Sequence, residues 1–236
     1  MAHSSPKTGS ASMQVTLHDT SDSSPCNGEA MSASVSNLHF HGLNVTPVCH
    51  SDEVVNTLVQ PGQEFDYSVQ IPLNEPSGLY WYHPHPHGFS EGQVQGGATG
   101  AIIVEGIQQA NLSFVGLPEQ TLVLRNLLVP VSEQNATNVP ASDISLDNVP
   151  VNFPAYTPAL PVAPNQQQLW RVLNSAADTI FNLQYVVAGT AQQLTVVAID
   201  GVPITGGLSR RAPYSSLPAA ALSLSSLLPL SGRARN

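Results

Sequence analysis

Short stretches in which apolar and polar residues alternate recur along the first half of the chain and predict β-strands. The clearest stretch is residues 64–71, where Phe65, Tyr67 and Val69 fall on one face, because residues i and i+2 of a strand point to the same side. Further strands are expected at residues 13–17, 32–43, 79–85 and 101–105. Turn-forming residues separate these stretches, and this spacing favours an antiparallel sandwich or barrel.

The second half of the chain shows the same pattern and predicts a second β unit. Strands are expected at residues 120–130, 167–174, 181–187 and 192–204, with a hairpin element at 146–153. This half contains no histidine, since all eight histidines lie at or before His87. Any histidine-based metal chemistry is therefore confined to the first half.

The alternation divides the chain into four parts. Residues 1–12 are expected to be a flexible leader, 13–112 a first β domain and 117–207 a partial second one. Residues 208–236 contain no acidic residue and many serines, leucines and arginines. We expect them to form an irregular, disordered tail, and the alternative is a helix over residues 219–228.

Composition narrows the class of protein. The chain has 236 residues, of which 42% are hydrophobic and 10% are charged, so it can bury a core and is not disordered by composition. Its formal net charge of −9 argues against nucleic acid or an anionic membrane as a partner. Residues 1–24 lack the apolar segment of a secretory signal. The apolar residues 217–230 are interrupted by prolines and short of the roughly 20 that a membrane span needs.

Cys26 and Cys49 are the two cysteines of the chain. An even pair permits a disulfide in an oxidising compartment but does not demonstrate one. A bridge would tie together the loops on either side of the expected strand that carries His39 and His41. Two free thiols are the alternative.

Two His-x-His pairs carry the chemistry that the sequence suggests. The first is His39-Phe-His41, and the second is His83-Pro-His85, which continues through Pro86 to His87. Proline fixes φ near −65° and pushes the residue before it out of the helical region. The second pair therefore lies on a stiff, extended segment.

The two imidazoles of such a pair point to one side of an extended chain, with Cα atoms about 6.6 Å apart at roughly 3.3 Å per residue. This separation suits a cluster of metal ions better than a single ion. Imidazole is a good ligand for copper, zinc, iron and nickel, whereas magnesium and calcium prefer carboxylates, which do not cluster beside these histidines. The alternative is that the pairs bind no metal.

Three motifs resemble the first cupredoxin domain of multicopper oxidases, and most closely that of the bacterial laccase-like and copper-efflux oxidases. They are Asn-Leu-His-Phe-His-Gly-Leu at 37–43, Gly-Leu-Tyr-Trp-Tyr-His-Pro-His-Pro-His-Gly at 78–88 and Gly-Gly-Ala-Thr-Gly-Ala-Ile-Ile-Val-Glu at 96–105. Residues 170–174 and 198–203 resemble the middle, copper-free domain. The resemblance covers residues 13–207 and implies an all-β fold of cupredoxin-like Greek-key sandwiches, one near-complete and one partial.

The resemblance also implies a role for each histidine of the two pairs. His39 matches a type 2 copper ligand, His41 and His83 match ligands of one type 3 copper, and His85 matches a ligand of the other. His87 follows the ligand pair and is expected in the second shell or at the surface.

An acidic residue in the loop after the first pair relays protons in this family. Asp52 is the nearest match in this chain, with Glu53 as the second choice. His50 lies in the same loop, and we expect it to be an exposed residue rather than a ligand.

The chain departs from the family in one decisive respect. No His-Cys-His or His-x-x-His-x-His run follows His87, and a type 1 copper site needs a cysteine thiolate with two imidazoles. The sequence therefore indicates the N-terminal portion of a laccase-like oxidase, with half of a type 2/type 3 copper site and no type 1 site, inactive by itself. The alternatives are a copper-binding module without catalysis and a structural remnant.

The resemblance finally suggests partners and a location. Copper ions, oxygen and a phenolic, amine or metal-ion reductant are implied, together with a possible second chain that carries the missing C-terminal cupredoxin domain. Nucleic acid and membrane are not expected. The family is often periplasmic or secreted, but the sequence leaves the location open.

Overall fold

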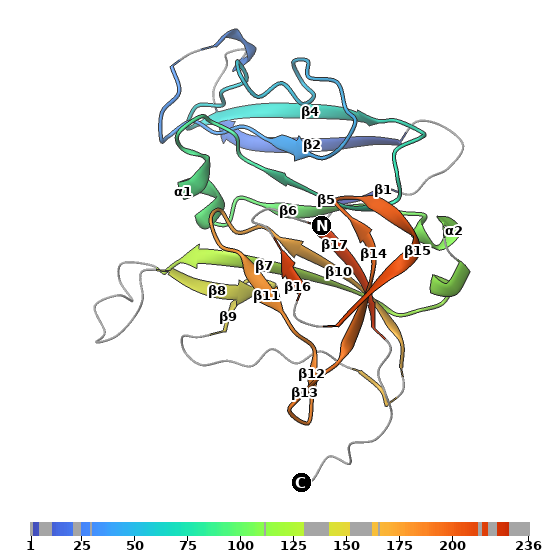
Figure 1. Cartoon of the computed structure of the whole chain (residues 1–236). Helices are drawn as coiled ribbons and strands as arrows, with labels where there is room; N and C mark the ends of the chain where they lie inside the picture. Colours follow the sequence, from blue (N-terminus) through green and yellow to red (C-terminus); the bar gives the residue numbers. More distant parts are fainter. Residues whose placement is uncertain are drawn as a thin grey trace, which may run out of the picture.

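A computed structural model describes residues 2–4, 11–20, 25–28, 30–110, 112–129, 142–151, 162–164, 166–211, 214–216 and 221–226. Its strands lie in layers, with a two-stranded sheet, a four-stranded sheet and a seven-stranded sheet stacked one above another (Figure 1). The first two layers form the first domain, and the third belongs to the second domain.

The first domain pairs β2 with β4 in one sheet and orders β1, β6, β5 and β3 in the other. A single helical turn, α1, lies between β5 and β6, and a short 3-10 segment, η1, precedes β3. The elements are β1 (Ala2–Ser4), β2 (Ala11–Thr20), η1 (Pro25–Asn27), β3 (His39–His41), β4 (Gln63–Ile71), β5 (Gly78–His83), α1 (Ser90–Gln95) and β6 (Gly100–Val104).

The second domain orders its large sheet as β15, β14, β17, β10, β7, β8 and β9, with two small two-stranded sheets beside it. The connection between the domains carries α2 (Ile107–Ala110) and η2 (Leu112–Phe114). The strands are β7 (Glu119–Leu128), β8 (Ser142–Leu146), β9 (Val149–Pro150), β10 (Gln168–Asn174), β11 (Phe181–Leu183), β12 (Val186–Val187), β13 (Thr190–Ala191), β14 (Gln193–Ile199), β15 (Val202–Arg211), β16 (Tyr214–Ser216) and β17 (Ala221–Ser226).

The core of the first domain lies between its two sheets. Strand β4 alternates strictly between buried and exposed residues, as its sequence predicts, so Phe65, Tyr67, Val69 and Ile71 all face the other sheet. They pack against Phe40 of β3 and against residues of β5 and β6. Burying this apolar face is the main force that holds the two sheets together.

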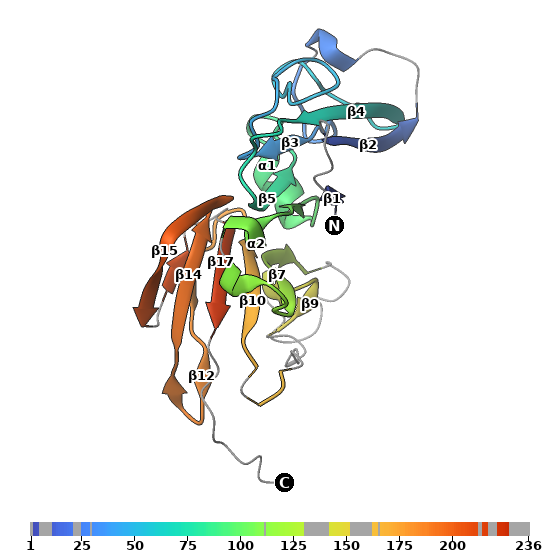
Figure 2. The same ribbon diagram turned by 90° about the vertical axis from the view of Figure 1, so that its right-hand side faces the viewer.

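Strands β5 and β6 are buried on both faces, which explains why their sequences are apolar without alternation. In β5, Tyr80 belongs to the core of the first domain, whereas Leu79 and Trp81 pack on Val123 and Leu173 of the second domain. Figure 2 shows the second domain against this side of the first. The four-stranded sheet is thus shared by two cores.

Hydrogen bonds and a close backbone contact also join the two domains, in addition to the apolar packing. Arg125 of β7 donates hydrogen bonds to the carbonyl oxygens of Thr99 (2.7 Å) and Gly97 (3.4 Å) in the turn before β6. The β14–β15 turn lies against the start of β5, because a Cβ added to Gly78 would lie only 2.5 Å from the Cα atom of Gly201.

The structure corrects the expected flexible leader at residues 1–12. Strand β1 pairs in parallel with β6, and β2 begins at Ala11 and extends to Thr20. Residues 1 and 5–10 lie outside the described residues. The expected strand at 32–43 is also shorter, since only His39–His41 forms a strand, with one isolated bridge between Ser36 and Val59.

The expected disordered tail from residue 208, and the alternative helix at 219–228, are also wrong for the described residues. Strand β15 runs on to Arg211, β16 pairs with β11, and β17 lies between β14 and β10. The backbone groups of β10 and β14 need partners on that side, and residues 221–226 supply them. Within the described part of the chain, no helix is long and apolar enough to cross a membrane.

Candidate metal centre

Strands β3 and β5 place the two histidine pairs side by side. The strands are antiparallel, with His39 opposite His83 and His41 opposite Trp81. Residues directly opposite each other in such a pair point to the same face of the sheet. The first pair and His83 therefore share one face, the face on which Trp81 packs towards the second domain.

A ring nitrogen of the first histidine pair lies close to a ring nitrogen of the second pair, across the two strands. His41 Nδ1 lies 3.3 Å from His83 Nε2, and one ring nitrogen each of His39, His41 and His83 lies within 4.8 Å of the others. Two nitrogens bound at about 2 Å to one tetrahedral ion lie roughly 3.3 Å apart. The gap between His41 and His83 therefore fits a single metal ion, held across the strands rather than within either pair.

His85 completes the cluster from the segment after β5. Its ring centroid lies 5.3 Å from that of His39 and 5.8 Å from that of His83. Its Nδ1 atom is buried and has no hydrogen-bond partner, which is unusual for a buried polar atom. His87 is exposed and touches the cluster only through its ring, 5.2 Å from that of His85.

Asp52 holds the ring of His39. Its carboxylate accepts from His39 Nδ1 at 3.0 Å and from the backbone N–H of Phe40 at 2.7 Å. The proton therefore lies on Nδ1, and the lone pair of Nε2 is free for a metal ion. Partners of this kind fix the tautomer and orientation of metal-binding histidines.

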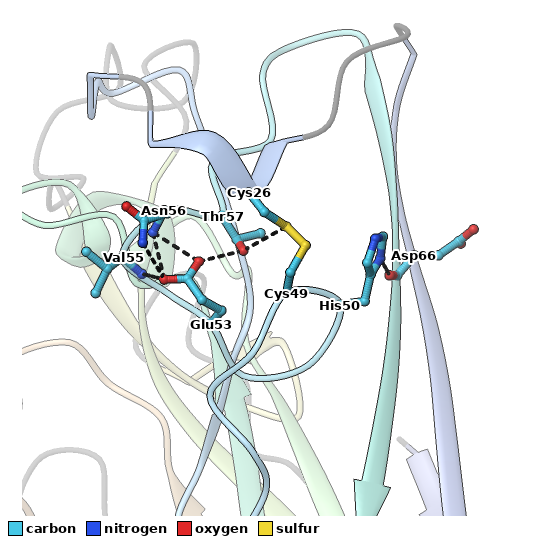
Figure 3. The surroundings of a disulfide bond; sticks show 8 residues. All are labelled: Cys26, Cys49, His50, Glu53, Val55, Asn56, Thr57 and Asp66. Atoms are coloured by element: carbon cyan, nitrogen blue, oxygen red, sulfur yellow. Dashed lines mark hydrogen bonds between the residues drawn. A yellow bond between two sulfur atoms is a disulfide. The ribbon is translucent and has the colours of Figure 1, made fainter.

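Glu53, the second choice for the acidic role, lies apart from the histidines. Its carboxylate accepts hydrogen bonds from the backbone N–H groups of Val55 and Asn56 and from the hydroxyl of Thr57 (Figure 3). These contacts hold the turn that follows Asp52. Desolvation by itself would raise the pKa of Glu53, but the hydrogen bonds from this turn outweigh it and lower the pKa below its usual value.

The two cysteines form a disulfide bond, which settles the alternative that the sequence left open. Cys26 and Cys49 have Cα atoms 5.9 Å apart, and the bridge ties η1 to the loop that carries Asp52 (Figure 3). His50, next in the chain, stacks its ring on Phe65 and bonds the carbonyl oxygen of Asp66 at 2.7 Å. It is exposed and lies outside the histidine cluster, as expected.

The pKa values of His41, His83 and His85 all lie below the ordinary value for histidine. Burial lowers the pKa of His83 to about 4, with a hydrogen bond to Pro84 opposing it and the neighbouring histidines adding to it. Partial burial also lowers the pKa of His41, although the residue as a whole is exposed. The charge of His39 lowers this pKa further, and the charge of Asp200 raises it. Burial and His39 lower the pKa of His85. Neutral imidazole is the form that binds metal ions.

The donor set fits a copper-type ion. In the described residues the cluster consists of imidazoles alone. His83 Nδ1 lies 2.8 Å from the Pro84 carbonyl oxygen, which places the proton on Nδ1 and leaves the Nε2 lone pair facing His41. Trp81 stacks on the ring of His83 at 4.3 Å and holds it in the direction of His41. Imidazoles without carboxylates suit copper or zinc rather than magnesium or calcium.

Sequence reasoning gave no role to two of the residues around the site. Asn37 stands in the first motif, but its buried contacts depend on folding. Asp200 comes from the second domain, on the turn that lies against β5, and its charge acts on His41. The apolar character of β5 and β6 was the one signal that a second domain covers this sheet.

A two-layer β domain with clustered imidazoles between neighbouring strands is an arrangement that could hold a copper-type ion, and comparisons with known proteins indicate a family. Residues 30–109 match the family model for multicopper oxidases. The chain is 29% identical over 182 residues to an iron transport multicopper oxidase of Kluyveromyces lactis, covering 70% of this chain and 26% of that protein. It is 27% identical over 192 residues to a multicopper oxidase of Mycobacterium tuberculosis, covering 71% and 37%.

Solved structures agree on the fold. The multicopper oxidase McoA of Aquifex aeolicus superimposes with a TM-score of 0.70 at 19% identity, covering 92% of this chain and 45% of that one. The blue copper oxidase of Nitrosomonas europaea gives 0.67 at 18% identity, covering 94% and 64%. The family model, the curated relatives and the solved structures all indicate the multicopper oxidase family, and the chain has the cupredoxin fold and aligns with the N-terminal portion of these longer proteins. It spans 26% and 37% of the length of the two curated relatives.

Proposed function

We propose that this chain supplies half of the type 2/type 3 trinuclear copper site of a laccase-like multicopper oxidase. His39 would bind the type 2 ion, His41 and His83 one type 3 ion, and His85 the other. The observation that carries the proposal is the 3.3 Å approach of His41 Nδ1 to His83 Nε2. This approach joins the two motifs at the position where the family would place one ion.

Bound copper would supply the electron transfer and the reduction of oxygen to water, and the protein would arrange its surroundings. Asp52 keeps the proton of His39 on Nδ1 and leaves Nε2 free. The Pro84 carbonyl oxygen does the same for His83. Because the Asp52 carboxylate contacts a ligand ring, we also assign to it the relay of protons towards the site.

The remaining ligands would come from protein that this sequence does not contain. No histidine follows His87, so a full trinuclear site and a type 1 copper need another cupredoxin domain. We propose that this domain, on a separate chain or segment, faces the histidine cluster. A phenolic, amine or metal-ion reductant would deliver electrons there, and oxygen would be the acceptor.

Copper analysis of the purified chain tests this function. After loading with Cu(II) and removal of excess metal, the wild-type chain should retain copper, and His41→Ala/His83→Ala should lose more copper affinity than the roughly 10–100-fold that the loss of an outer-shell partner costs, because it removes two proposed ligands. His50→Ala is the matched control, because His50 is an exposed histidine outside the cluster, and it should bind copper like the wild type.

Oxygen uptake with a phenolic donor separates the remaining possibilities. We expect none from the chain alone and uptake only after a C-terminal cupredoxin domain is added. Copper retention that never leads to oxygen uptake would instead favour a copper-binding module without catalysis. A wild-type chain that retains no copper, or a loss of copper in His50→Ala as large as in the double variant, contradicts the proposal.

A further inference from the structure

Asn37 is a fully buried side chain two residues before His39, and it connects three parts of the site. Its amide nitrogen donates to the carbonyl oxygens of Val54 and Thr57, both at 3.0 Å. Its amide oxygen accepts from the backbone N–H of His85 at 2.7 Å. One side chain thus holds the strand of the first histidine pair, the loop after Asp52 and the segment of the second pair.

These contacts use the amide fully and in one orientation. An asparagine side chain has two N–H donors and one carbonyl acceptor, and here the donors face two carbonyl oxygens while the acceptor faces an N–H group. Rotating the amide by 180° would bring oxygen against oxygen and N–H against N–H. Neither aspartate, which lacks the donors, nor serine, which is shorter, can reproduce the three bonds.

The three hydrogen-bond partners of Asn37 lie next to residues of the metal centre, so these bonds also position the site. Val54 and Thr57 bracket the turn that follows Asp52, and Asp52 sets the tautomer of His39. His85 is the fourth histidine of the cluster, on a segment that leaves β5 at His83 and is no longer held by the sheet. Its N–H bond to Asn37 therefore fixes where the His85 ring lies relative to His39.

We propose that Asn37 is a positioning residue of the metal centre, which sets both the Asp52–His39 contact and the place of His85. This inference rests on the proposed copper function for its purpose, but the arrangement it describes exists in the metal-free protein. It can therefore be tested with and without copper.

Three substitutions separate positioning from a general loss of packing. Asn37→Asp keeps the shape and removes both donors, and Asn37→Ser keeps a small polar group and avoids a buried charge, should the aspartate prevent folding. Asn174→Asp is the matched control. Asn174 is equally buried, donates to the Thr179 carbonyl oxygen and accepts from the Ala176 N–H, but it lies in the second domain.

The first readout is the metal-free protein. Long-range 1H–15N spectra of the histidine rings report the tautomer of His39, and amide exchange reports the protection of the His85 N–H. We expect both Asn37 variants to shift the His39 ring signals and to speed His85 exchange by about tenfold, because the His85 N–H loses its hydrogen-bond acceptor. The control should change neither.

The second readout is copper. In the folded Asn37 variants, Cu(II) should bind about 10–100-fold more weakly and give an altered electron paramagnetic resonance spectrum, with Asn174→Asp within about twofold of wild type. Unchanged ring signals and exchange in folded Asn37 variants overturn the inference. If the wild-type chain binds no copper, the copper function is overturned. If the histidine ring signals nevertheless shift in Asn37→Asp, the positioning role remains in place.

Discussion

His41 Nδ1 and His83 Nε2 lie 3.3 Å apart although 41 residues separate them in the chain. The contact arises from the antiparallel register of β3 and β5, not from either His-x-His motif alone. Spacing within each motif predicts a metal cluster, but which nitrogens lie close enough to share an ion depends on the register between the strands. The arrangement of the cluster therefore depends on the pairing of these two strands.

Replacing Asp52 by Asn should weaken copper binding, because the amide loses the negative charge that keeps the His39 proton on Nδ1. Loss of such an outer-shell partner costs about 10–100-fold in metal affinity. Competition with a chelator of known affinity measures the effect. Glu53→Gln is the matched control, since Glu53 bonds Val55, Asn56 and Thr57 instead of a histidine, and equal losses in the two variants would contradict the role of Asp52.

Removing the disulfide with Cys26→Ser/Cys49→Ser should lower the free energy of unfolding of the first domain by about 3 kcal/mol, as expected for a loop of this size. The two cysteines are separated by 23 positions, and the bridge restrains the loop that carries Asp52. Urea unfolding measures the change. Wild-type protein that has been reduced and alkylated should behave like the double variant, and stability equal to that of the oxidised wild type would refute the prediction.

Gly78→Ala should disturb the contact between the domains. Its Cβ would lie 2.5 Å from the Gly201 Cα atom, and overpacking against backbone costs about 1–3 kcal/mol. Thermal unfolding measures the loss. Gly92→Ala is the matched control, because a Cβ there meets nothing within 4 Å and alanine favours the α1 helix by up to about 1 kcal/mol. A Gly78 variant as stable as the Gly92 variant would show that the turn moves aside freely.

Alkaline pH should destabilise the fold through Tyr67. Burial is the main cause that raises the pKa of Tyr67 above its usual value near 10, and its hydroxyl accepts from the Leu38 N–H at 2.9 Å. Below pH 10 the Tyr67 hydroxyl keeps its proton in both the folded and the unfolded chain, so its contribution to the free energy of unfolding is fully present. Above pH 10 the unfolded chain releases the proton first, and each such group then costs up to about 1.4 kcal/mol per pH unit.

Urea unfolding at pH 8 and at pH 11 tests this sign. Tyr67→Phe should be less stable than wild type at pH 8, since the Leu38 N–H loses its acceptor, but it should lose less stability between the two pH values. An equal or steeper loss in the variant would show that Tyr67 does not contribute to the alkaline sensitivity.

The sequence predicted those features that depend only on residues close together in the chain. The alternation around Phe65 and Tyr67 predicts β4 and its buried face, and the proline-flanked histidines predict an extended segment that is not helical. The pairing of His39 with His83 could not be predicted from either motif, because it depends on register between distant strands. Asn37 could not be recognised either, since its three partners come together only in the fold.

The second domain shows where pattern reading fails. Residues 221–226 read Ala-Leu-Ser-Leu-Ser-Ser, an alternation that is short and rich in serine, and the charge and composition of the surrounding residues made it look like a tail. The need of β10 and β14 for backbone partners decides the outcome. The sequence of residues 221–226 does not show that two other strands have unpaired backbone groups.

The position of β17 also sets an order of events during synthesis. Strands β10 and β14 emerge first and pair with each other only through β17, so until residue 226 has left the ribosome each has an open edge. Open edges invite pairing with other chains, and distant pairings form late because the intervening chain must first close a loop. The nascent second domain is therefore most exposed to aggregation before residues 221–226 emerge, and slow translation there would prolong the risk.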